Sequence, residues 1–248
     1  MMADGGTADA ANVALFDGLA TDWWDSEGSS KLLHRVNPVR MGFIRAQAVA
    51  HFGLDANARR VLAGLRAVDV GCGAGLVAEP LARMGADVTG LDAGVATIAA
   101  ARAHAAAQGL DIRYQTGEVA ALAADAPGGF DLVTCLEVVE HVADVPAFLA
   151  SLKALMKPGG LLIFSTPNRT LMSWAVMIGA AEKLLKLIPD HGHSWRQFIT
   201  PDELTQRLAE AGLRVEAMAG IGWSPVRGFA LGADRSVNYI GTAVVAGG

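Results

Sequence analysis

The stretch VDVGCGAG, residues 68 to 75, places three glycines directly after a short apolar run that is typical of a β-strand. Gly71, Gly73 and Gly75 let a ligand approach the backbone closely, and a helix that starts here offers its free N–H groups to that ligand. Loops that bind dinucleotides carry a further glycine or alanine, and Leu76 occupies that position here. The loop, a weak signal when taken alone, therefore favours a smaller nucleoside ligand.

From about residue 67 onward, short apolar runs alternate with alanine-rich helical segments, as in proteins built from βα units. We expect a Rossmann-like α/β fold: a seven-stranded, mostly parallel sheet with helices on both faces. The last two strands, in LRVEAMAG (213–220) and VNYIGTAVVA (237–246), are expected to form an antiparallel C-terminal hairpin.

Two helix boundaries are marked clearly. Thr200 is followed by Pro201 and by Glu203 three residues on, which is the pattern of a capping box, and Gly212 ends the same helix. Residues 157–160, KPGG, are expected to close a helix that begins near Asp144.

The composition suits one domain. The 248 residues are 52% hydrophobic, enough to bury one sheet. We expect a disordered tail at 1–14 and a single domain at 15–248, with an N-terminal segment at 15–60 and an insertion at 168–198. A formal net charge of −5 leaves no broad basic surface, so binding to nucleic acid is not expected.

Neither a disulfide framework nor a targeting segment is expected. Cys72 and Cys135 lack the spacing of a metal or redox motif and are read as core residues. The first fourteen residues lack the features of a signal peptide. The longest apolar run, 171–181, is shorter than the ~20 residues of a membrane span. We therefore expect a cytoplasmic protein.

Asp92 ends the next expected strand, VTGLD, 21 residues after Gly71. A carboxylate at this place accepts hydrogen bonds from both hydroxyls of a ribose. The alternative is that Asp92 only caps the helix that starts at Gly94. Strand, glycine turn and terminal acid together favour the ribose interpretation.

The stretch CLEVVEHV, 135–142, follows the expected fourth strand, at the edge where open α/β sheets bind ligands. If a helical turn follows Leu136, then Glu137, Glu140 and His141 stand at i, i+3 and i+4 and share one face. The alternative is that the two acids only favour a helix start and that the histidine is a satisfied rim residue.

This cluster suggests two ways to activate a phenol, whose pKa is about 10. His141 can accept the hydroxyl proton as general base. Alternatively, Glu137, Glu140 and His141 together hold Mg²⁺, against which a substrate oxygen loses its proton more readily.

The G-x-G-x-G loop with an acid after the second strand resembles the class I S-adenosylmethionine-dependent methyltransferases, from about residue 68 to 245. The resemblance implies that the glycine loop holds the methionine end of the cofactor and that Asp92 binds ribose. It further implies that Leu136 contacts the cofactor and that residues 117–119, Gly117, Glu118 and Val119, flank adenine. A solvated loop charge is the alternative for Glu118.

A second, more specific resemblance rests on many separate motifs: WWD-x-EG and LH-x-VNP-x-R before the domain, then VDVGCG, GLD, TC-x-E-x-x-EHV, KPGG, FST-x-NR and VNY. These are similar to the ubiquinone-biosynthesis O-methyltransferases. The resemblance implies an N-terminal helical lid over the cofactor and a contact between Arg40 and S-adenosylmethionine, with a surface ion pair as the alternative for Arg40. Pro167 differs from the leucine of some relatives.

The same resemblance implies the substrates. These are the hydroxyls of 2-polyprenyl-6-hydroxyphenol and of 3-demethylubiquinol, and the implied partners include the membrane surface that holds their tails. A complex with other enzymes of ubiquinone biosynthesis is left open. In residues 171–189, an apolar helical stripe lies beside lysines, which is typical of an interfacial helix, or of a helix that packs over the active site. The stripe comprises Trp174, Met177, Ile178, Ala181, Leu185 and Ile188.

Three other functions compete with this interpretation. They are a methyltransferase of the same architecture that acts on another phenol or small metabolite, a nucleotide-binding module without catalysis, and a dehydrogenase. Leu76 and the lack of a second domain disfavour the dehydrogenase.

Overall fold

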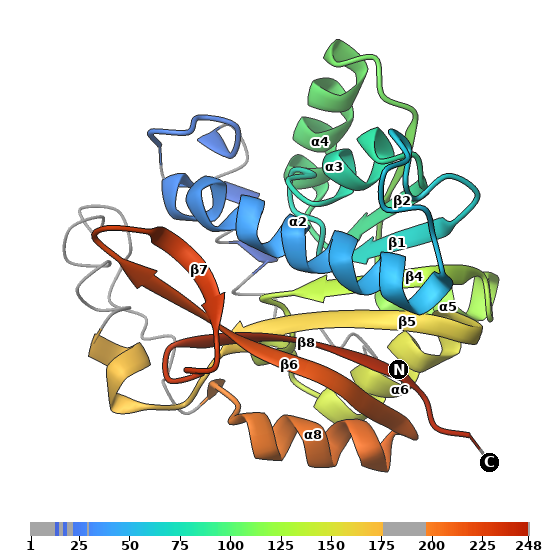
Figure 1. Cartoon of the computed structure of the whole chain (residues 1–248). Helices are drawn as coiled ribbons and strands as arrows, with labels where there is room; N and C mark the ends of the chain where they lie inside the picture. Colours follow the sequence, from blue (N-terminus) through green and yellow to red (C-terminus); the bar gives the residue numbers. More distant parts are fainter. Residues whose placement is uncertain (1–12, 15–16, 19–21, 29, 176–196, 248) are drawn as a thin grey trace, which may run out of the picture.

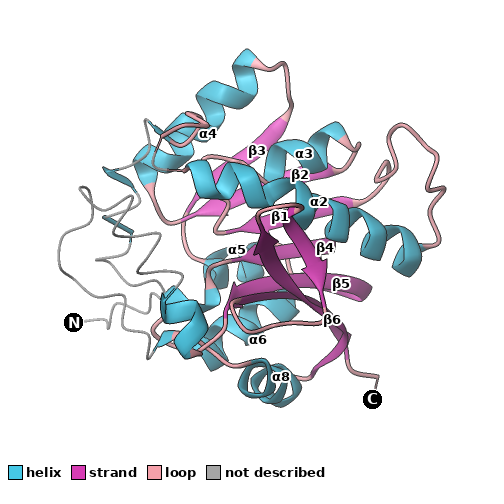
Figure 2. Ribbon diagram, turned by 60° about the vertical axis from the view of Figure 1, so that its left-hand side comes forward, coloured by secondary structure: helices cyan, strands magenta, loops and turns pink. Residues whose placement is uncertain are grey.

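A computed structural model describes residues 13–14, 17–18, 22–28, 30–175 and 197–247. The strands form one twisted sheet with the order β3-β2-β1-β4-β5-β8-β6-β7. Figure 1 labels every strand of this sheet except β3, which Figure 2 labels. The first five strands pair in parallel, and β8 enters antiparallel between β5 and β6. The strands are β1 (Arg66–Val70), β2 (Asp87–Asp92), β3 (Ile112–Thr116), β4 (Phe130–Leu136), β5 (Met156–Pro167), β6 (Leu213–Ser224), β7 (Gly228–Gly232) and β8 (Asn238–Val245).

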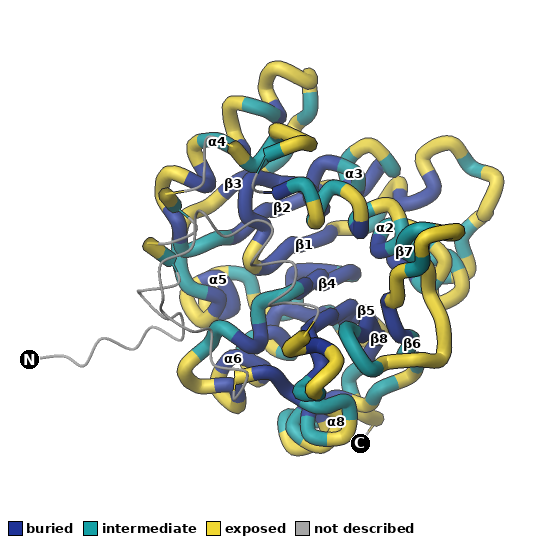
Figure 3. Tube along the Cα trace, turned by 90° about the vertical axis from the view of Figure 1, so that its left-hand side faces the viewer, coloured by how far each residue is buried: buried dark blue, intermediate teal, exposed yellow. Residues whose placement is uncertain are grey.

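Helices cover both faces of the sheet, as predicted (Figure 2). Because side chains alternate along a strand, Val68 and Val70 pack on one face and Ala67 on the other. The first face carries α5 (Val119–Asp125), α6 (Val145–Leu155) and α8 (Pro201–Glu210). The second face carries α2 (Lys31–Phe52), α3 (Ala78–Arg83) and α4 (Val95–Ala107). The central strands are therefore buried from both sides, as Figure 3 shows.

The sheet has one strand more than predicted. The seven expected strands are present, but β6 continues to Ser224 and turns back into β7 at the edge of the sheet. The glycines in this stretch are typical of a loop, whereas Gly220, Gly222 and Gly232 all take part in the β6–β7 ladder. A glycine lowers the stability of a strand but does not exclude it from a sheet. Here five residue pairs along the hairpin hold β6 and β7 together.

The helix boundaries agree with the sequence at α8 and differ at α6. In α8, the Thr200 hydroxyl accepts from the Glu203 N–H while the Glu203 carboxylate accepts from the Thr200 N–H, which confirms the capping box. The α6 helix begins after Asp144, whose side chain caps it. It already ends at Leu155, so KPGG belongs to the start of β5 and does not close the helix.

Part of the predicted organisation lies outside the described residues. The tail at 1–12 and residues 176–196, which hold most of the insertion and of the predicted interfacial helix, are in this group. Residues 171–175 are described and helical, with Leu171 and Trp174 exposed. Within the part of the chain that the structure describes, no helix is long and apolar enough to cross a membrane.

Candidate active site

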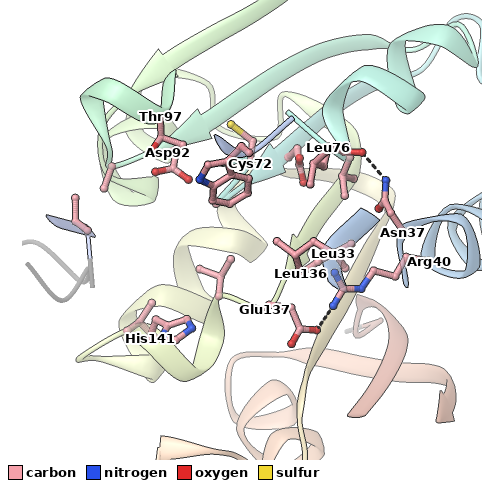
Figure 4. A pocket seen from close by; sticks show the side chains of 18 residues that line it. Leu33, Asn37, Arg40, Cys72, Leu76, Asp92, Thr97, Leu136, Glu137 and His141 are labelled. Atoms are coloured by element: carbon pink, nitrogen blue, oxygen red, sulfur yellow. Dashed lines mark hydrogen bonds and ion pairs between the residues drawn. The ribbon is translucent and has the colours of Figure 1, made fainter. Parts of the chain in front are cut away.

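A cleft of about 190 Å³ opens where the carboxyl ends of β1, β2 and β4 meet. The strand order reverses at β1, and this is the place where open α/β sheets bind ligands. The walls come from the N-terminal segment, from the loop after β1, from the end of β2 and from the residues after β4 (Figure 4). The predicted site residues that line the cleft are Arg40, Gly71, Asp92, Leu136, Glu137 and His141.

The three glycines after β1 all have positive φ, at 71° for Gly71, 53° for Gly73 and 96° for Gly75. Only Gly71 lines the cleft. A Cβ atom on Gly73 would collide with the Trp23 ring, and one on Gly75 would collide with the Tyr114 hydroxyl. A Cβ atom on Gly71 would collide with Val138. Each of the three glycines therefore makes room for a neighbouring side chain, and Gly71 in addition lines the cleft.

Asp92 lies between the glycine loop and α4. Its carboxylate accepts from the Gly73 N–H at 2.9 Å and from the Gly94 N–H at 2.8 Å. Burial raises its pKa. Each oxygen keeps a further lone pair for a ligand hydroxyl.

A second acid lies at the start of α4, beside the Gly94 N–H that Asp92 binds. Asp17, in the N-terminal segment, accepts from both the N–H and the hydroxyl of Thr97 at 2.9 Å. Thr97 is the third residue of α4, so Asp17 caps this helix across 80 residues of sequence. These hydrogen bonds lower the Asp17 pKa. Asp17 was not among the predicted site residues, because local spacing contains no signal for such a contact.

Asp69 is a further cleft residue that sequence reasoning missed. It is 2% exposed on β1, and the Thr134 hydroxyl donates to it at 2.7 Å. Burial raises its pKa to about 7. The available signal was an acid inside an apolar strand, two residues before the first glycine.

The N-terminal segment closes over the glycine loop. The Trp24 indole N–H donates to the Ala74 carbonyl at 3.1 Å, and the Asn37 amide donates to the Leu76 carbonyl at 2.6 Å. Trp23 lines the cleft, and its carbonyl accepts from His34 Nε2 at 2.8 Å. From the described N-terminal segment, Trp23 and the α2 residues Leu33, Asn37 and Arg40 line the cleft. That this segment acts as a lid over a cofactor stays a prediction.

Arg40 is buried on α2, and its Nη2 lies 2.7 Å from Glu137 Oε1. The Glu137 carboxylate also accepts from the Ser165 hydroxyl at 2.7 Å and from the Asn238 amide at 3.0 Å. Arg40 therefore forms an ion pair, as the alternative interpretation held. The pair is largely buried, so it is not the surface ion pair that this interpretation expected. Glu137 links α2, β4, β5 and β8 through these contacts, while its φ of 56° is the only positive value at a described non-glycine residue.

Glu140 and His141 are oriented differently from Glu137. Glu140 is 5% exposed, does not line the cleft, and accepts from the Thr166 hydroxyl at 2.9 Å. Burial, with a smaller contribution from the charge of Glu137, raises its pKa to about 8. His141 lines the cleft, with its Nε2 3.9 Å from Glu140 Oε1. In Figure 4, Arg40 and Glu137 point toward each other, and His141 lies apart from them.

The prediction that these three side chains share one face is therefore wrong. The turn after β4 is a 3₁₀ turn at Val139–His141, preceded by Glu137 with positive φ, and not a regular α-helical turn. Among the described residues, no three histidine, cysteine or acidic side chains are grouped closely enough to hold a metal ion. In this arrangement the set Glu137, Glu140 and His141 does not fit Mg²⁺.

The remaining predicted contacts lie along the same edge of the sheet. Leu136, at the end of β4, lines the cleft. A smaller hollow adjoins it and shares Gly71 and Asp92 with it. Gly117, Glu118 and Val119, the residues expected near adenine, line that second hollow.

Comparison with known proteins identifies the family. A family model described as a methyltransferase domain matches residues 43–218. A curated relative from Azorhizobium caulinodans, named ubiquinone biosynthesis O-methyltransferase, is 46% identical over 234 residues, which cover 94% of this chain and 92% of the relative. The chain belongs to this O-methyltransferase family. A relative of the same name from a Caulobacter species is 44% identical over 235 residues, covering 94% of this chain and 93% of the relative.

Solved structures agree with the fold. Magnesium protoporphyrin IX methyltransferase from Synechocystis, with bound SAH, is 25% identical with a TM-score of 0.58, covering 84% of this chain and 82% of that one. A S-adenosylmethionine-dependent methyltransferase from Clostridium acetobutylicum has a TM-score of 0.61 at 14% identity, covering 88% of this chain and 99% of that one. Together with the methyltransferase family model and the curated relatives, the Synechocystis structure identifies the protein as an S-adenosylmethionine-dependent methyltransferase.

Proposed function

We propose that this methyltransferase transfers a methyl group from S-adenosylmethionine to phenolic hydroxyls of polyprenylated substrates in ubiquinone biosynthesis. The observation that carries the proposal is the cleft itself. It brings Gly71, Asp92 and His141 together under Trp23, in a chain 46% identical to a relative with this activity in its name. The proposed substrates are 2-polyprenyl-6-hydroxyphenol and 3-demethylubiquinol.

The cofactor is proposed to lie along the edge of the sheet, with its ribose at Asp92. The carboxylate is oriented by two backbone N–H groups, so it needs no rearrangement to accept ribose hydroxyls. The smaller hollow beside Val119 suits the adenine ring, and Leu136 is proposed to contact the cofactor from the wall of the larger cleft. Arg40 is proposed to attract the cofactor's carboxylate, although Glu137 already neutralises part of its charge.

S-adenosylmethionine supplies a methyl group on a positively charged sulfur. The attacking phenol must lose its proton as the new carbon–oxygen bond forms, and His141 is proposed to accept it. Neighbouring Glu140 has a pKa of about 8, so it is mostly neutral at pH 7 and adds little negative charge beside the imidazole.

A magnesium ion at Glu137, Glu140 and His141 stays a prediction without support from the geometry. Binding there would require Glu137 to leave Arg40 and Asn238, and Glu140 to lose its proton. Turnover measured after exhaustive chelation, and again after Mg²⁺ is restored, tests it. Full activity in the chelated enzyme would show that the reaction needs no magnesium ion.

The decisive experiment is methyl transfer to short-chain analogues of both substrates. We expect a methylated phenol and one equivalent of S-adenosylhomocysteine per turnover. Transfer only to unrelated phenols would favour a methyltransferase of different specificity, and cofactor binding without turnover would favour a non-catalytic module. In cells, the quinone intermediates that accumulate when the protein is absent identify the blocked step by mass spectrometry.

Contact with a membrane surface is proposed because a long isoprenoid tail resides in lipid. Leu171 and Trp174, at the start of the insertion, are 77% and 49% exposed, as an interfacial segment requires. The membrane contact is tested by flotation with anionic liposomes. The variant Leu171→Glu, Trp174→Glu is expected to float less than wild type, whereas Val95→Glu, at an exposed position on α4, is the matched control. Equal flotation of all three proteins contradicts this role.

Peripheral placement on the inner face of the cytoplasmic membrane, and any complex with other enzymes of the pathway, stay predictions.

A further inference from the structure

The two consecutive tryptophans of the N-terminal segment have different surroundings. Trp23 lies over Gly73 and forms part of the cleft wall. Trp24 does not line the cleft. Its ring lies parallel to the His104 ring, with centroids 3.5 Å apart and an interplanar angle of 8°. The His34 ring of α2 contacts the Trp24 ring edge-on, with centroids 6.1 Å apart. Trp24 is therefore held from outside the cleft, by face-to-face stacking on a residue of α4 and by an edge contact from α2.

His104 is in turn fixed by a buried acid. Its Nδ1 lies 2.6 Å from Oε1 of Glu79, which is 2% exposed in the first turn of α3. A carboxylate oxygen only accepts, so Nδ1 carries the hydrogen and the imidazole plane is set by the bond. Arg83, at 3.4 Å, is the only other described ion-pair partner of Glu79. An acid this buried needs its partners, which keeps the His104 ring in place.

Trp24 connects the His104 ring to the glycine loop. With its face against the imidazole, the indole directs its N–H to the Ala74 carbonyl, between Gly73 and Gly75. The preceding residue, Trp23, is then placed against Gly73. Neither Glu79 nor His104 lines either hollow. The Glu79 N–H donates to the Gly75 carbonyl at 3.0 Å, as part of the first turn of the helix. The side chains of Glu79 and His104 reach the cleft through the two tryptophans.

We propose that Glu79 and His104 are positioning residues for S-adenosylmethionine: together they seat Trp24 on the glycine loop, and Trp24 holds Trp23 as a wall of the cofactor cleft. The inference rests on the proposed function only in assuming that the cofactor binds in this cleft. It assigns a purpose to each tryptophan of the WWD motif, with Trp24 as the anchor and Trp23 as the wall.

A double-mutant cycle with His104→Ala, Trp24→Ala and both substitutions tests the proposal. Loss of a stacked pair is expected to raise the Kd and the KM for S-adenosylmethionine by about 2- to 10-fold. The kcat at saturating cofactor is expected to change less than about twofold, because neither residue touches the reacting groups. In the Trp24→Ala background, His104→Ala is expected to add no further loss, since the two residues act as one unit.

Two further variants separate positioning from general damage to the fold. His104→Phe keeps a flat ring for stacking and is expected to recover part of the cofactor affinity that His104→Ala loses. His51→Ala, at an exposed histidine near the end of α2, is the matched control and is expected to leave the Kd unchanged. Thermal melting of each variant identifies any that fails to fold.

The outcomes are distinguishable from failure of the proposed function. If calorimetry shows no S-adenosylmethionine binding by wild type, the proposed function itself fails. If wild type binds but His104→Ala has the same Kd, or if its effect is equally large with and without Trp24, Glu79 and His104 are not positioning residues. A loss confined to kcat contradicts the proposal as well.

Discussion

At the scale of single residues, the candidate site is set by how each acid is satisfied. Asp92 accepts two backbone N–H groups and remains at the cleft, whereas Glu137 is paired with Arg40. Glu140 is buried with one hydroxyl partner, Thr166, and its pKa rises to about 8. Asp92 and Glu137 thus differ in their partners, and Glu140 differs in its pKa. His141 lines the cleft and carries a ring nitrogen that can accept a proton.

Replacing His141 tests the proposed proton acceptor. His141→Ala is expected to lower kcat by about 10²- to 10⁴-fold, the usual contribution of a general base. The Kd for S-adenosylmethionine is expected to stay within about twofold, because the cofactor is held by the loop and Asp92. Initial rates and calorimetry measure the two effects separately. Unchanged turnover would rule out the base assignment.

Glu140 is expected to make stability depend on pH. Its pKa is raised in the folded state, so the folded protein binds a proton that the unfolded chain releases above about pH 4.5. Its contribution to stability is therefore complete below that pH and is lost as the pH rises through about 8. Glu140→Gln keeps the acceptor for Thr166 and cannot ionise. We expect its melting temperature to decline less than that of wild type across this range, and parallel declines would contradict the shift.

At the scale of elements, contacts between distant residues join the N-terminal segment to the sheet and to α4, and two of them are open to a direct test. Asp17 caps α4, and Arg40 of α2 pairs with Glu137 after β4. Both contacts link residues far apart in sequence. They hold in place the elements that carry the cleft walls. Removal of either contact is therefore expected to lower the free energy of unfolding more than it lowers kcat.

The cap on α4 is tested by Asp17→Ala. Removal of a side-chain acceptor from a helix start costs about 1 kcal/mol. Asp17→Asn keeps an acceptor oxygen and is expected to recover most of the loss. Denaturant unfolding of the three proteins measures the difference. If Asp17→Ala is as stable as wild type, the N-terminal segment does not support α4 in solution.

The Arg40–Glu137 pair is tested by removing one or both partners. Glu137→Ala leaves a buried guanidinium without its partner, which costs about 3 kcal/mol. The double variant Arg40→Met, Glu137→Ala removes the unpaired charge and is expected to be more stable than Glu137→Ala alone. A double variant that is no more stable than Glu137→Ala in denaturant unfolding would show that the unpaired guanidinium is not the cause of the loss.

At the scale of the whole molecule, the cofactor is expected to stabilise the fold by binding across its parts. The cleft joins the N-terminal segment to the loops after β1, β2 and β4. Saturation at about 100 times Kd adds roughly 2.7 kcal/mol. For a domain of this size that corresponds to a rise in melting temperature of about 5 to 10 °C. Asp92→Ala is expected to reduce the rise, and an equal rise in this variant would place the ribose elsewhere.

The sequence by itself determined the periodic, local features. Short apolar runs and glycine punctuation predicted the five parallel strands, and the capping box at Thr200 predicted α8. Asp92, Leu136 and His141 were found because the carboxyl ends of parallel strands meet at one edge, so position in the strand pattern gives position in space. The strand β7 was missed because its glycines resemble a loop until β6 pairs with them.

Only the tertiary structure decided which side chains meet. The capping of α4 by Asp17, the pairing of Arg40 with Glu137 and the stacking of Trp24 on His104 each join residues from separate elements. No spacing rule encodes such contacts, because they depend on how elements pack and not on the period of one helix or strand. The orientation of Glu137 and Glu140 was decided in the same way, since burial and the available partners fix where a carboxylate points.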